Sequence, residues 1–419
     1  MRYGLPLILL ALMAARGNAA GTATWEMGSY QDFLRGQFTG VSLSRDGRLM
    51  LAPKTETLFS SDQPVIWSVA QAPDGTLYAA TGHRGRVFKV DKSGKSEVVW
   101  TADQPEVFAV ALDAKGTLYA ASSPKGKIYR IEGGKAVEFF SPGSVYIWSL
   151  VFARDGTAFV GTGDEGKVFR VDRSGKGEIY YETGQTHVTT LALDTQGRLL
   201  AGTEPNGILY RIEAKGKAFV LYDADLPEIR AITTASDGVI YAAAQGGAST
   251  RRGIAATQAA PGGMGKPVVS ATATTITVTD EAQGGVEIKP KPEAAKQAPA
   301  VTPQVTTQFS PIVDVSGIEK SALYRIWPDN TVETLWSSKD ENVYDVLPSG
   351  GQIVFSTDGK GRIYRLGADR KVTLLVQTNE SEATRLVQGA GGLLAATGNL
   401  GKIFRLSDAT EASGVYEAP

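Results

Sequence analysis

The sequence predicts an all-β fold, a seven-bladed β-propeller with one long disordered insertion. One short pattern of six residues occurs seven times: a glycine or another small residue, a base in most copies, an aliphatic residue, an aromatic residue, Arg or Lys, and a second aliphatic residue. The copies recur regularly, because successive aromatic residues lie 41, 40, 41, 114, 40 and 40 residues apart, at Phe88, Tyr129, Phe169, Tyr210, Tyr324, Tyr364 and Phe404. A period of about 40 residues in a strand-rich chain is typical of propeller blades.

Each repeat predicts four strands separated by turns. In the first repeat the apolar run 65–71 predicts the inner strand, 76–81 the second, 86–90 the third and 96–100 the outer strand. The inner strands are apolar on both faces, which suits a sheet packed between two neighbours. The later repeats begin near Glu106, Tyr146, His187, Glu228, Asn342 and Glu382.

The chain before the first repeat predicts how the ring closes. Residues 25–34 are compatible with a short helix, and residues 41–52 predict a hairpin around Asp46 and Gly47. Residues 55–61 stand where an outer strand should precede the first repeat. An open ring would leave unpaired strand edges, so we expect Thr55–Ser61 to lie beside Lys402–Leu406. We therefore assign residues 21–40 to an N-terminal lead-in and residues 41–419 to the propeller.

Residues 1–20 predict a secretory signal peptide. Arg2 precedes an apolar stretch, and small residues occupy positions 17–20. The alternative is an uncleaved membrane anchor, which the short length disfavours, and no later segment is long and apolar enough to span a bilayer. We expect an exported protein, periplasmic or extracellular. The chain has no cysteine, which excludes disulfides, thiolate metal sites and a thiol nucleophile.

The charge balance excludes one class of partner. The chain has 43 basic and 44 acidic residues, a formal net charge of −1, which gives no bias towards nucleic acid or an anionic membrane. We expect a monomer without stable membrane insertion.

The fifth repeat is interrupted between its second and third strands. Residues 246–320 are rich in alanine, proline, threonine and glycine, a composition that cannot bury enough apolar surface to order itself. Two interpretations are open: a disordered insertion tolerated at a loop tip within blade 5, or a lid or tether over one face of the ring.

No nucleophile elbow, phosphate-binding loop or zinc-protease motif is present, and the chain has only two histidines.

Alignment of the repeats gives one position at which the residues differ chemically from blade to blade. The column that opens the inner strand contains Val65, Glu106, Tyr146, His187, Glu228, Asn342 and Glu382. This end of the inner strands forms the channel mouth of a propeller, on the face that carries the insertion. Two interpretations are open: solvated rim residues, or a Ca²⁺ or Mg²⁺ site formed by Glu106, Glu228, Asn342 and Glu382 with His187 as a catalytic base.

A second column lies two positions further along. It contains Trp67, Phe108, Trp148, Thr189, Arg230, Tyr344 and Thr384. An aromatic wall opposite polar residues would suit a sugar or another amphipathic ligand, whereas the alternative is packing between blades. The candidate ligand-binding residues are Tyr146, Trp67, Trp148, Arg230 and Tyr344. The base that recurs in every third strand is assigned to architecture.

The pattern DG-x-[IL]-[YF] followed by G-[KR]-[IV]-[FY]-R-[IVL] resembles secreted bacterial propellers of the NHL-repeat, streptogramin-lyase-like and gluconolactonase-like groups, over about residues 41–419. Residues 24–53 also resemble the start of a family of exported propellers from environmental bacteria. Longer members of that family carry a further β-domain after a segment like 413–419, so we expect that domain to be absent here or lost.

The resemblance implies two classes of function. Gluconolactonase-like enzymes hold a divalent cation through acidic and amide side chains at the channel mouth, where Glu106, Glu228, Asn342 and Glu382 are similar in kind. Streptogramin-lyase-like enzymes use a histidine base with Mg²⁺, and His187 is the candidate at this rim. We expect a non-catalytic extracytoplasmic propeller that binds a protein or glycan partner through the channel-mouth face. The alternative is a divalent-cation-assisted lyase or lactone hydrolase at the same face.

Overall fold

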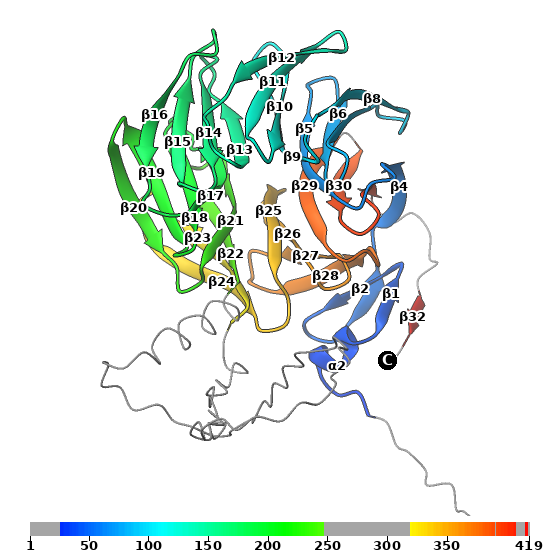
Figure 1. The fold of residues 1–419 in the computed structure, drawn as a ribbon. Helices are drawn as coiled ribbons and strands as arrows, with labels where there is room; N and C mark the ends of the chain where they lie inside the picture. The colour runs from blue at the N-terminus through cyan, green and yellow to red at the C-terminus, as the bar shows by residue number, and fades with distance from the viewer. Residues whose placement is uncertain (1–25, 247–318, 390, 408–414, 418–419) are drawn as a thin grey trace, which may run out of the picture.

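The computed structural model describes residues 26–246, 319–389, 391–407 and 415–417 (Figure 1). The predicted signal peptide and residues 247–318 of the predicted insertion lie outside the described residues, so both stay predictions. Seven antiparallel sheets form a ring, which confirms the seven-bladed propeller. No helix in the described ranges is long and apolar enough to cross a membrane.

Blades 1 to 4 each consist of four consecutive strands, numbered from the channel outwards. Blade 1 contains β5 (Ile66–Gln71), β6 (Leu77–Thr81), β7 (Arg86–Val90) and β8 (Ser96–Thr101). Blade 2 contains β9 (Glu106–Leu112), β10 (Leu118–Ser123), β11 (Lys127–Glu132) and β12 (Lys135–Phe140). Blade 3 contains β13 (Ile147–Phe152), β14 (Ala158–Thr162), β15 (Lys167–Val171) and β16 (Gly177–Glu182). Blade 4 contains β17 (His187–Leu193), β18 (Leu199–Glu204), β19 (Ile208–Ala214) and β20 (Lys217–Asp223).

Blades 5 to 7 complete the ring. Blade 5 contains β21 (Glu228–Thr234), β22 (Ile240–Gln245), β23 (Ser321–Ile326) and β24 (Val332–Ser338), and residues 247–318 fall between its second and third strands. Blade 6 contains β25 (Val343–Ser349), β26 (Gln352–Thr357), β27 (Arg362–Leu366) and β28 (Val372–Gln377). Blade 7 contains β29 (Ala383–Gly389), β30 (Gly392–Thr397), β31 (Lys402–Ser407) and the N-terminal β4 (Lys54–Ser60).

The pairing of β4 with β31 closes the ring. The register joins Lys54 to Ser407 and Ser60 to Lys402. This confirms the predicted closure by residues 55–61, displaced by one residue. The first and last parts of the chain thus share one sheet, and β4 covers the edge that β31 would otherwise leave open.

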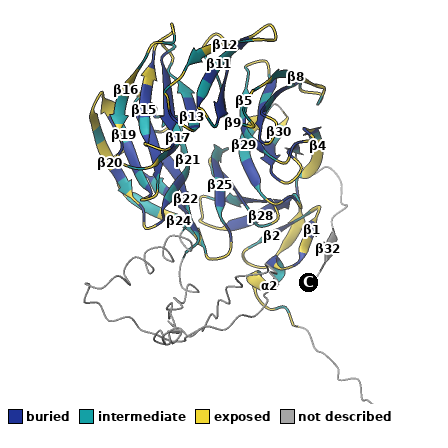
Figure 2. Cartoon of the chain, in the orientation of Figure 1, coloured by how far each residue is buried: buried dark blue, intermediate teal, exposed yellow. Residues whose placement is uncertain are grey.

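The N-terminal segment also completes blade 6. The predicted hairpin is present as β2 (Val41–Ser44) and β3 (Leu49–Leu51), but β2 pairs with the outer strand β28, so this sheet has six strands. Helix α2 (Tyr30–Leu34) begins at a capping box of Ser29 and Asp32, and β1 (Gln37–Thr39) pairs with β32 (Val415–Glu417). Strand β28 is buried along its whole length, whereas the outer strands of blades 1 to 4 carry many exposed residues (Figure 2).

The recurring aromatic residue of the third strand packs against the preceding blade. Phe88 contacts Phe59 with ring centroids 5.1 Å apart, and Tyr324 contacts Tyr222 at 4.7 Å. The same arrangement joins Trp100 to Tyr129, Phe140 to Phe169, Tyr181 to Tyr210, and Trp336 to Tyr364. These pairs bury large apolar surfaces between blades, which explains why the sequence repeats an aromatic residue at this position.

The recurring base is architectural, as expected, although its partners vary. Lys89 lies 3.8 Å from Glu97, and Arg405 lies 3.1 Å from Glu56, in each case across to the outer strand. In blades 2 and 4 the base instead pairs with an acid two residues further along the chain, Glu132 or Glu213.

Candidate functional site

A β-bulge occurs at the same place in all seven inner strands. In each blade the pairing between the inner and second strands shifts by one residue. In each inner strand one residue has no residue opposite it in the second strand. These residues are Trp67, Phe108, Trp148, Thr189, Arg230, Tyr344 and Thr384. A bulge bends the strand and turns the extra side chain in a new direction. The second column of the sequence alignment is therefore a ring of bulge residues around the channel mouth.

The bulge residues of blades 1 to 3 form a continuous aromatic wall. Trp67 and Phe108 have ring centroids 5.5 Å apart, and Phe108 and Trp148 lie 4.5 Å apart. Tyr146 stacks on Trp148 at 5.1 Å. All four side chains are half-buried, so they pack against one another and still line the mouth. Phe108 was not among the expected ligand-binding residues, and the structure adds it to this wall.

Each tryptophan of the wall is bonded to the residue that opens the next blade. Trp67 Nε1 donates to Glu106 Oε2 at 2.6 Å, and the other carboxylate oxygen accepts the backbone N–H of His83 at 3.1 Å. Trp148 Nε1 donates to His187 Nδ1 at 3.1 Å. Both oxygens of Glu106 and one nitrogen of His187 are thus engaged by the protein itself.

Glycines make room for these two bonds. A Cβ atom at Gly82 would lie 2.7 Å from Trp67 Nε1 and 2.5 Å from Glu106 Oε2. A Cβ atom at Gly163 would lie 2.7 Å from His187 Nδ1. All three distances are shorter than a normal contact of a Cβ atom. Blades 1 and 3 therefore require a glycine after the second strand, because any larger residue would collide with the hydrogen-bonded side chains beside it.

Blades 4 to 6 carry polar residues at the position of these glycines. Glu204, Gln245 and Asp358 end or follow the second strands there. Gln245 Nε2 donates to Glu228 Oε2 at 2.8 Å, and Asp358 accepts two bonds from Asn342, at 2.8 and 2.9 Å. Sequence reasoning missed these three residues, although alignment of the repeats contains the signal: glycine in blades 1, 3 and 7, and an acid or amide in blades 4 to 6.

The polar half of the mouth links blades 5, 6 and 7. Arg230 Nη1 lies 3.4 Å from Glu228 Oε1, and its guanidinium lies over the ring of Tyr344, 5.4 Å from the centroid. Burial, followed by the nearby charge of Glu382, raises the pKa of Tyr344 to about 12. The tyrosine therefore stays protonated at neutral pH and can donate a hydrogen bond to a ligand.

Glu204 adds a second carboxylate to the mouth beside Glu228. It lies opposite His187 in the pairing of β17 with β18. Burial and then the negative charge of Glu228 raise the pKa of Glu204. In the described part of the chain no side chain or backbone group makes a hydrogen bond or ion pair to its carboxylate. Together Glu204 and Glu228 form an acidic pair beside the aromatic wall.

The expected metal ligands do not gather into one group. Across the described ranges, no set of three or more His, Asp or Glu side chains is arranged to hold a metal ion. Glu106 is bonded to Trp67, Glu228 to Gln245 and Asn342 to Asp358, each within its own part of the ring. The carbonyl oxygen of the Asn342 amide is buried without a hydrogen-bond partner among the residues described. The divalent cation stays a prediction.

No protein-family model matches the chain, and no curated protein matches it. Several solved structures do match the fold of this chain. Virginiamycin B lyase from Staphylococcus aureus is 13% identical, with a TM-score of 0.59 over 85% of this chain and 99% of that chain. The extracellular domain of the two-component system BT4673 from B. thetaiotaomicron is 8% identical, with a TM-score of 0.55 over 86% of this chain and 40% of that chain. YCF48 bound to a D1 peptide is 9% identical, with a TM-score of 0.55 over 87% and 98%.

At these identities the likeness is one of fold alone. It agrees with the ring of seven sheets and with the recurrence of the third-strand pattern. The chain therefore has the seven-bladed β-propeller architecture that streptogramin-lyase-like proteins share with extracellular and peptide-binding propellers.

Proposed function

We propose that this protein is a non-catalytic, extracytoplasmic binding module whose channel mouth receives part of a protein or glycan partner. The observation that carries the proposal is the division of one mouth into two halves. The aromatic wall of Trp67, Phe108 and Trp148 lies on one side, and the acidic pair of Glu204 and Glu228 begins where that wall ends.

The chemistry of the two halves favours a protein segment with a basic side chain. Aromatic faces bind aliphatic or aromatic groups, and they also attract cations. Glu204 makes no hydrogen bond or ion pair among the described residues. Burial and then the charge of Glu228 disfavour its ionised form, and the opposing influence of His187 and Arg230 does not cancel them. An ammonium or guanidinium group between the two carboxylates would relieve this repulsion. Arg230 and Tyr344 supply donors for backbone carbonyl groups of the same segment.

Two of the similar structures support this proposal in kind. YCF48 is described with a bound D1 peptide, and the BT4673 structure is an extracellular domain. Propellers host many functions, so the fold alone does not identify a partner, and the side chains of this mouth support the proposal instead.

The experiment is a selection of random twelve-residue peptides displayed on phage against the mature protein. The test variant combines Glu204→Gln with Glu228→Gln, which removes two charges and keeps the shapes. The control combines Glu97→Gln with Glu138→Gln, which removes two charges from exposed ion pairs on outer strands. We expect the wild type and the control to select lysine- or arginine-containing peptides, and the test variant to bind them at least about tenfold more weakly.

Other outcomes are equally informative. A glycan array is probed in parallel, and binding of a glycan that the same test variant loses would make the partner a glycan. Equal peptide affinity in the test variant and the control would contradict the role of the acidic pair. Failure of both libraries would contradict the proposal as a whole.

The alternative, a cation-assisted lyase or lactone hydrolase, predicts a different result. The wild type should turn over a streptogramin or a lactone, and this turnover should depend on Mg²⁺ or Ca²⁺ and be absent in His187→Ala. Such turnover would replace the binding proposal, because a non-catalytic module has no reaction to lose.

A further inference from the structure

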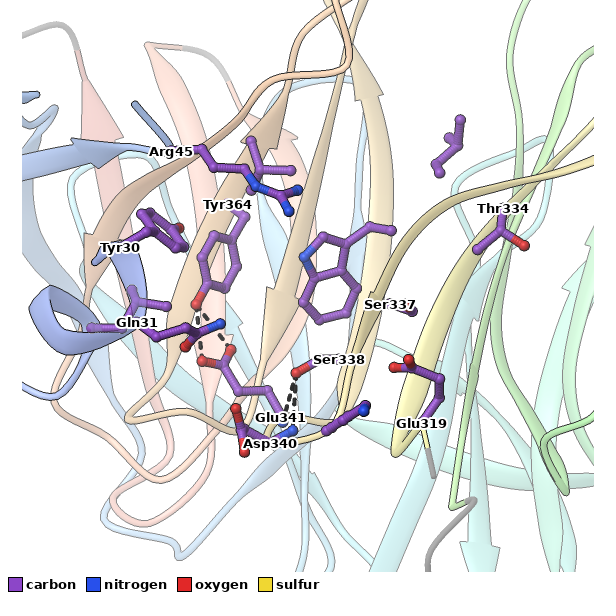
Figure 3. A pocket seen from close by; sticks show the side chains of 15 residues that line it. Tyr30, Gln31, Arg45, Glu319, Thr334, Ser337, Ser338, Asp340, Glu341 and Tyr364 are labelled. Atoms are coloured by element: carbon purple, nitrogen blue, oxygen red, sulfur yellow. Dashed lines mark hydrogen bonds between the residues drawn. The ribbon is translucent and has the colours of Figure 1, made fainter. Parts of the chain in front are cut away.

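A second candidate site lies on the side of the ring, away from the channel mouth. An open pocket of about 460 Å³ is lined mainly by α2, the outer strand β24 of blade 5 and the third strand β27 of blade 6 (Figure 3). None of the residues that form the channel mouth lines it. Its volume falls in the range of small-molecule sites in proteins.

The floor of this lateral pocket is a buried hydrogen-bonded network. Glu341 is 6% exposed and accepts hydrogen bonds from Thr357 Oγ1 at 2.7 Å and from Tyr364 Oη at 2.9 Å. Arg362 pairs with Glu341 and also donates to the carbonyl of Leu34 in α2. The helix and blade 6 are thereby joined, so the pocket keeps its shape without a ligand.

One wall carries a tyrosine hydroxyl and a guanidinium that no described residue binds. The hydroxyl of Tyr30 is buried and has no hydrogen-bond partner among the described residues. Burial raises the pKa of Tyr30 to about 12, so the hydroxyl can both donate and accept. Arg45 is near enough to act electrostatically on Tyr30, yet its guanidinium makes no hydrogen bond or ion pair with any described residue. Figure 3 shows Tyr30, Arg45 and Tyr364 on the same side of the pocket.

An aromatic ring and balanced charges complete the lining. The indole of Trp336 packs 4.9 Å from Phe355, and Trp336 also lines the pocket. The charged side chains without a partner inside the described ranges are two cations and two anions: Arg45, Lys339, Glu319 and Asp340. Donors and acceptors are therefore equally available, and the pocket does not select a strongly charged ligand.

We propose that the lateral pocket binds a neutral saccharide of one or two rings. Each hydroxyl of a sugar both donates and accepts a hydrogen bond, which matches the mixed polar lining. The C–H groups of a sugar ring pack against the negatively polarised face of an aromatic side chain, and Trp336 supplies such a side chain in this lining. The buried hydroxyl of Tyr30 gains a hydrogen-bond partner, which none of the described residues provides.

The test uses the mature full-length protein and a panel of defined sugars. Glucose, galactose, N-acetylglucosamine, maltose, cellobiose and chitobiose are the neutral probes, and galacturonate is the acidic probe. Binding is measured by saturation-transfer NMR and calorimetric titration. We expect at least one neutral sugar to bind. Tyr30→Phe and Arg45→Gln should each lower the affinity for that sugar about fivefold or more, because each substitution removes one hydrogen bond to it.

Matched controls make the result specific. Arg48→Gln removes an exposed cation from the hairpin that carries Arg45, and it should leave the affinity unchanged. The combined Glu204→Gln and Glu228→Gln variant should also bind the sugar normally, because it alters the channel mouth only. Absence of binding by every neutral sugar, equal affinity in Tyr30→Phe and Arg45→Gln, or binding of galacturonate alone would each overturn the proposal.

Discussion

Trp148 donates its indole N–H to Nδ1 of His187, 3.1 Å away, and so joins blade 3 to blade 4 at the channel mouth. Trp67 makes the same link from blade 1 to blade 2, with Glu106 as the acceptor at 2.6 Å. In both cases a bulge residue reaches the residue that opens the next inner strand. The same type of hydrogen bond thus orients two of the expected site residues, Glu106 and His187, and stabilises the contact between neighbouring blades.

The two tryptophan bonds should differ in strength because one acceptor is charged. Trp67→Phe removes a bond to a carboxylate and should cost about 1.5–3 kcal/mol of unfolding free energy, whereas Trp148→Phe removes a bond to a neutral ring and should cost about 1 kcal/mol. Urea unfolding measures both. Trp327→Phe, at an indole that is 38% exposed, is the control. A larger loss for Trp148→Phe would contradict this assignment.

The glycine below each bond should resist substitution for steric reasons alone. In Gly82→Ala the new methyl group would lie 2.7 Å from Trp67 Nε1, so the indole must move and the protein should lose about 1–3 kcal/mol. Gly28→Ala is the matched control, since its Cβ would meet nothing within 4 Å. Thermal denaturation of both variants tests the prediction, and an unchanged melting temperature in Gly82→Ala would refute it.

Glu204→Gln should stabilise the protein at neutral pH. Burial and then Glu228 raise the pKa of Glu204 above its ordinary value of 4.5, so folding disfavours its ionised form. The native state is therefore most stable below that ordinary value, and stability falls as pH rises through the raised pKa. Glutamine carries no charge, so at pH 7 the variant should unfold at a higher urea concentration than the wild type.

The pH dependence gives the control for this variant. Well below pH 4.5 the wild type is protonated at Glu204, and the two proteins should unfold at the same denaturant concentration. A variant that is less stable than the wild type at pH 7 would show that Glu204 has a stabilising partner.

Shortening the insertion should leave the ring intact. The N–H of Gly246 donates to the carbonyl of Lys320 at 3.0 Å, so the ends of the two flanking strands already meet. Replacing 247–319 with Asn-Leu, the residues between Gly398 and Gly401 in blade 7, should change the unfolding free energy by less than about 1 kcal/mol. A loss of several kcal/mol in chemical denaturation would show that the insertion packs on the propeller.

The N-terminal hairpin should behave as part of the core of blade 6. Leu43 is fully buried opposite Leu374, so Leu43→Ala should cost about 2–5 kcal/mol. Leu49 on the next strand is 44% exposed, and Leu49→Ala should change stability by less than about 0.5 kcal/mol. Equal effects in equilibrium unfolding would mean that β2 does not support the sheet in solution.

The ring and its closure could be predicted because they depend on repeated local patterns. The period of the third-strand aromatic residue predicts the number of blades, and an outer strand without a blade, residues 55–61, predicts the closure that β4 makes. The pairing of β2 with β28 could not be predicted, since it joins Leu43 to Leu374 across almost the whole chain and no repeat marks it.

The sequence alignment predicted which two positions of the repeat contribute residues to the site, but it did not predict the contacts that those residues make. Alignment placed Glu106, His187, Glu228, Asn342 and Glu382 at one end of the inner strands, and a third column with Glu204 and Asp358 was present but overlooked. A bulge depends on which residues pair across the sheet, so the direction of Trp67 or Arg230 could not be read from the chain alone.

The sequence by itself determined the architecture, because burial between blades demands the same residue types every 40 or 41 residues along the regular repeats. Only the tertiary structure decided what each polar residue of the mouth does. Trp67 engages Glu106 and Gln245 engages Glu228, and these partners come from a neighbouring blade or strand. A carboxylate already held by such a neighbour is restrained from joining the others around one ion, and that competition arises only when the blades are packed together.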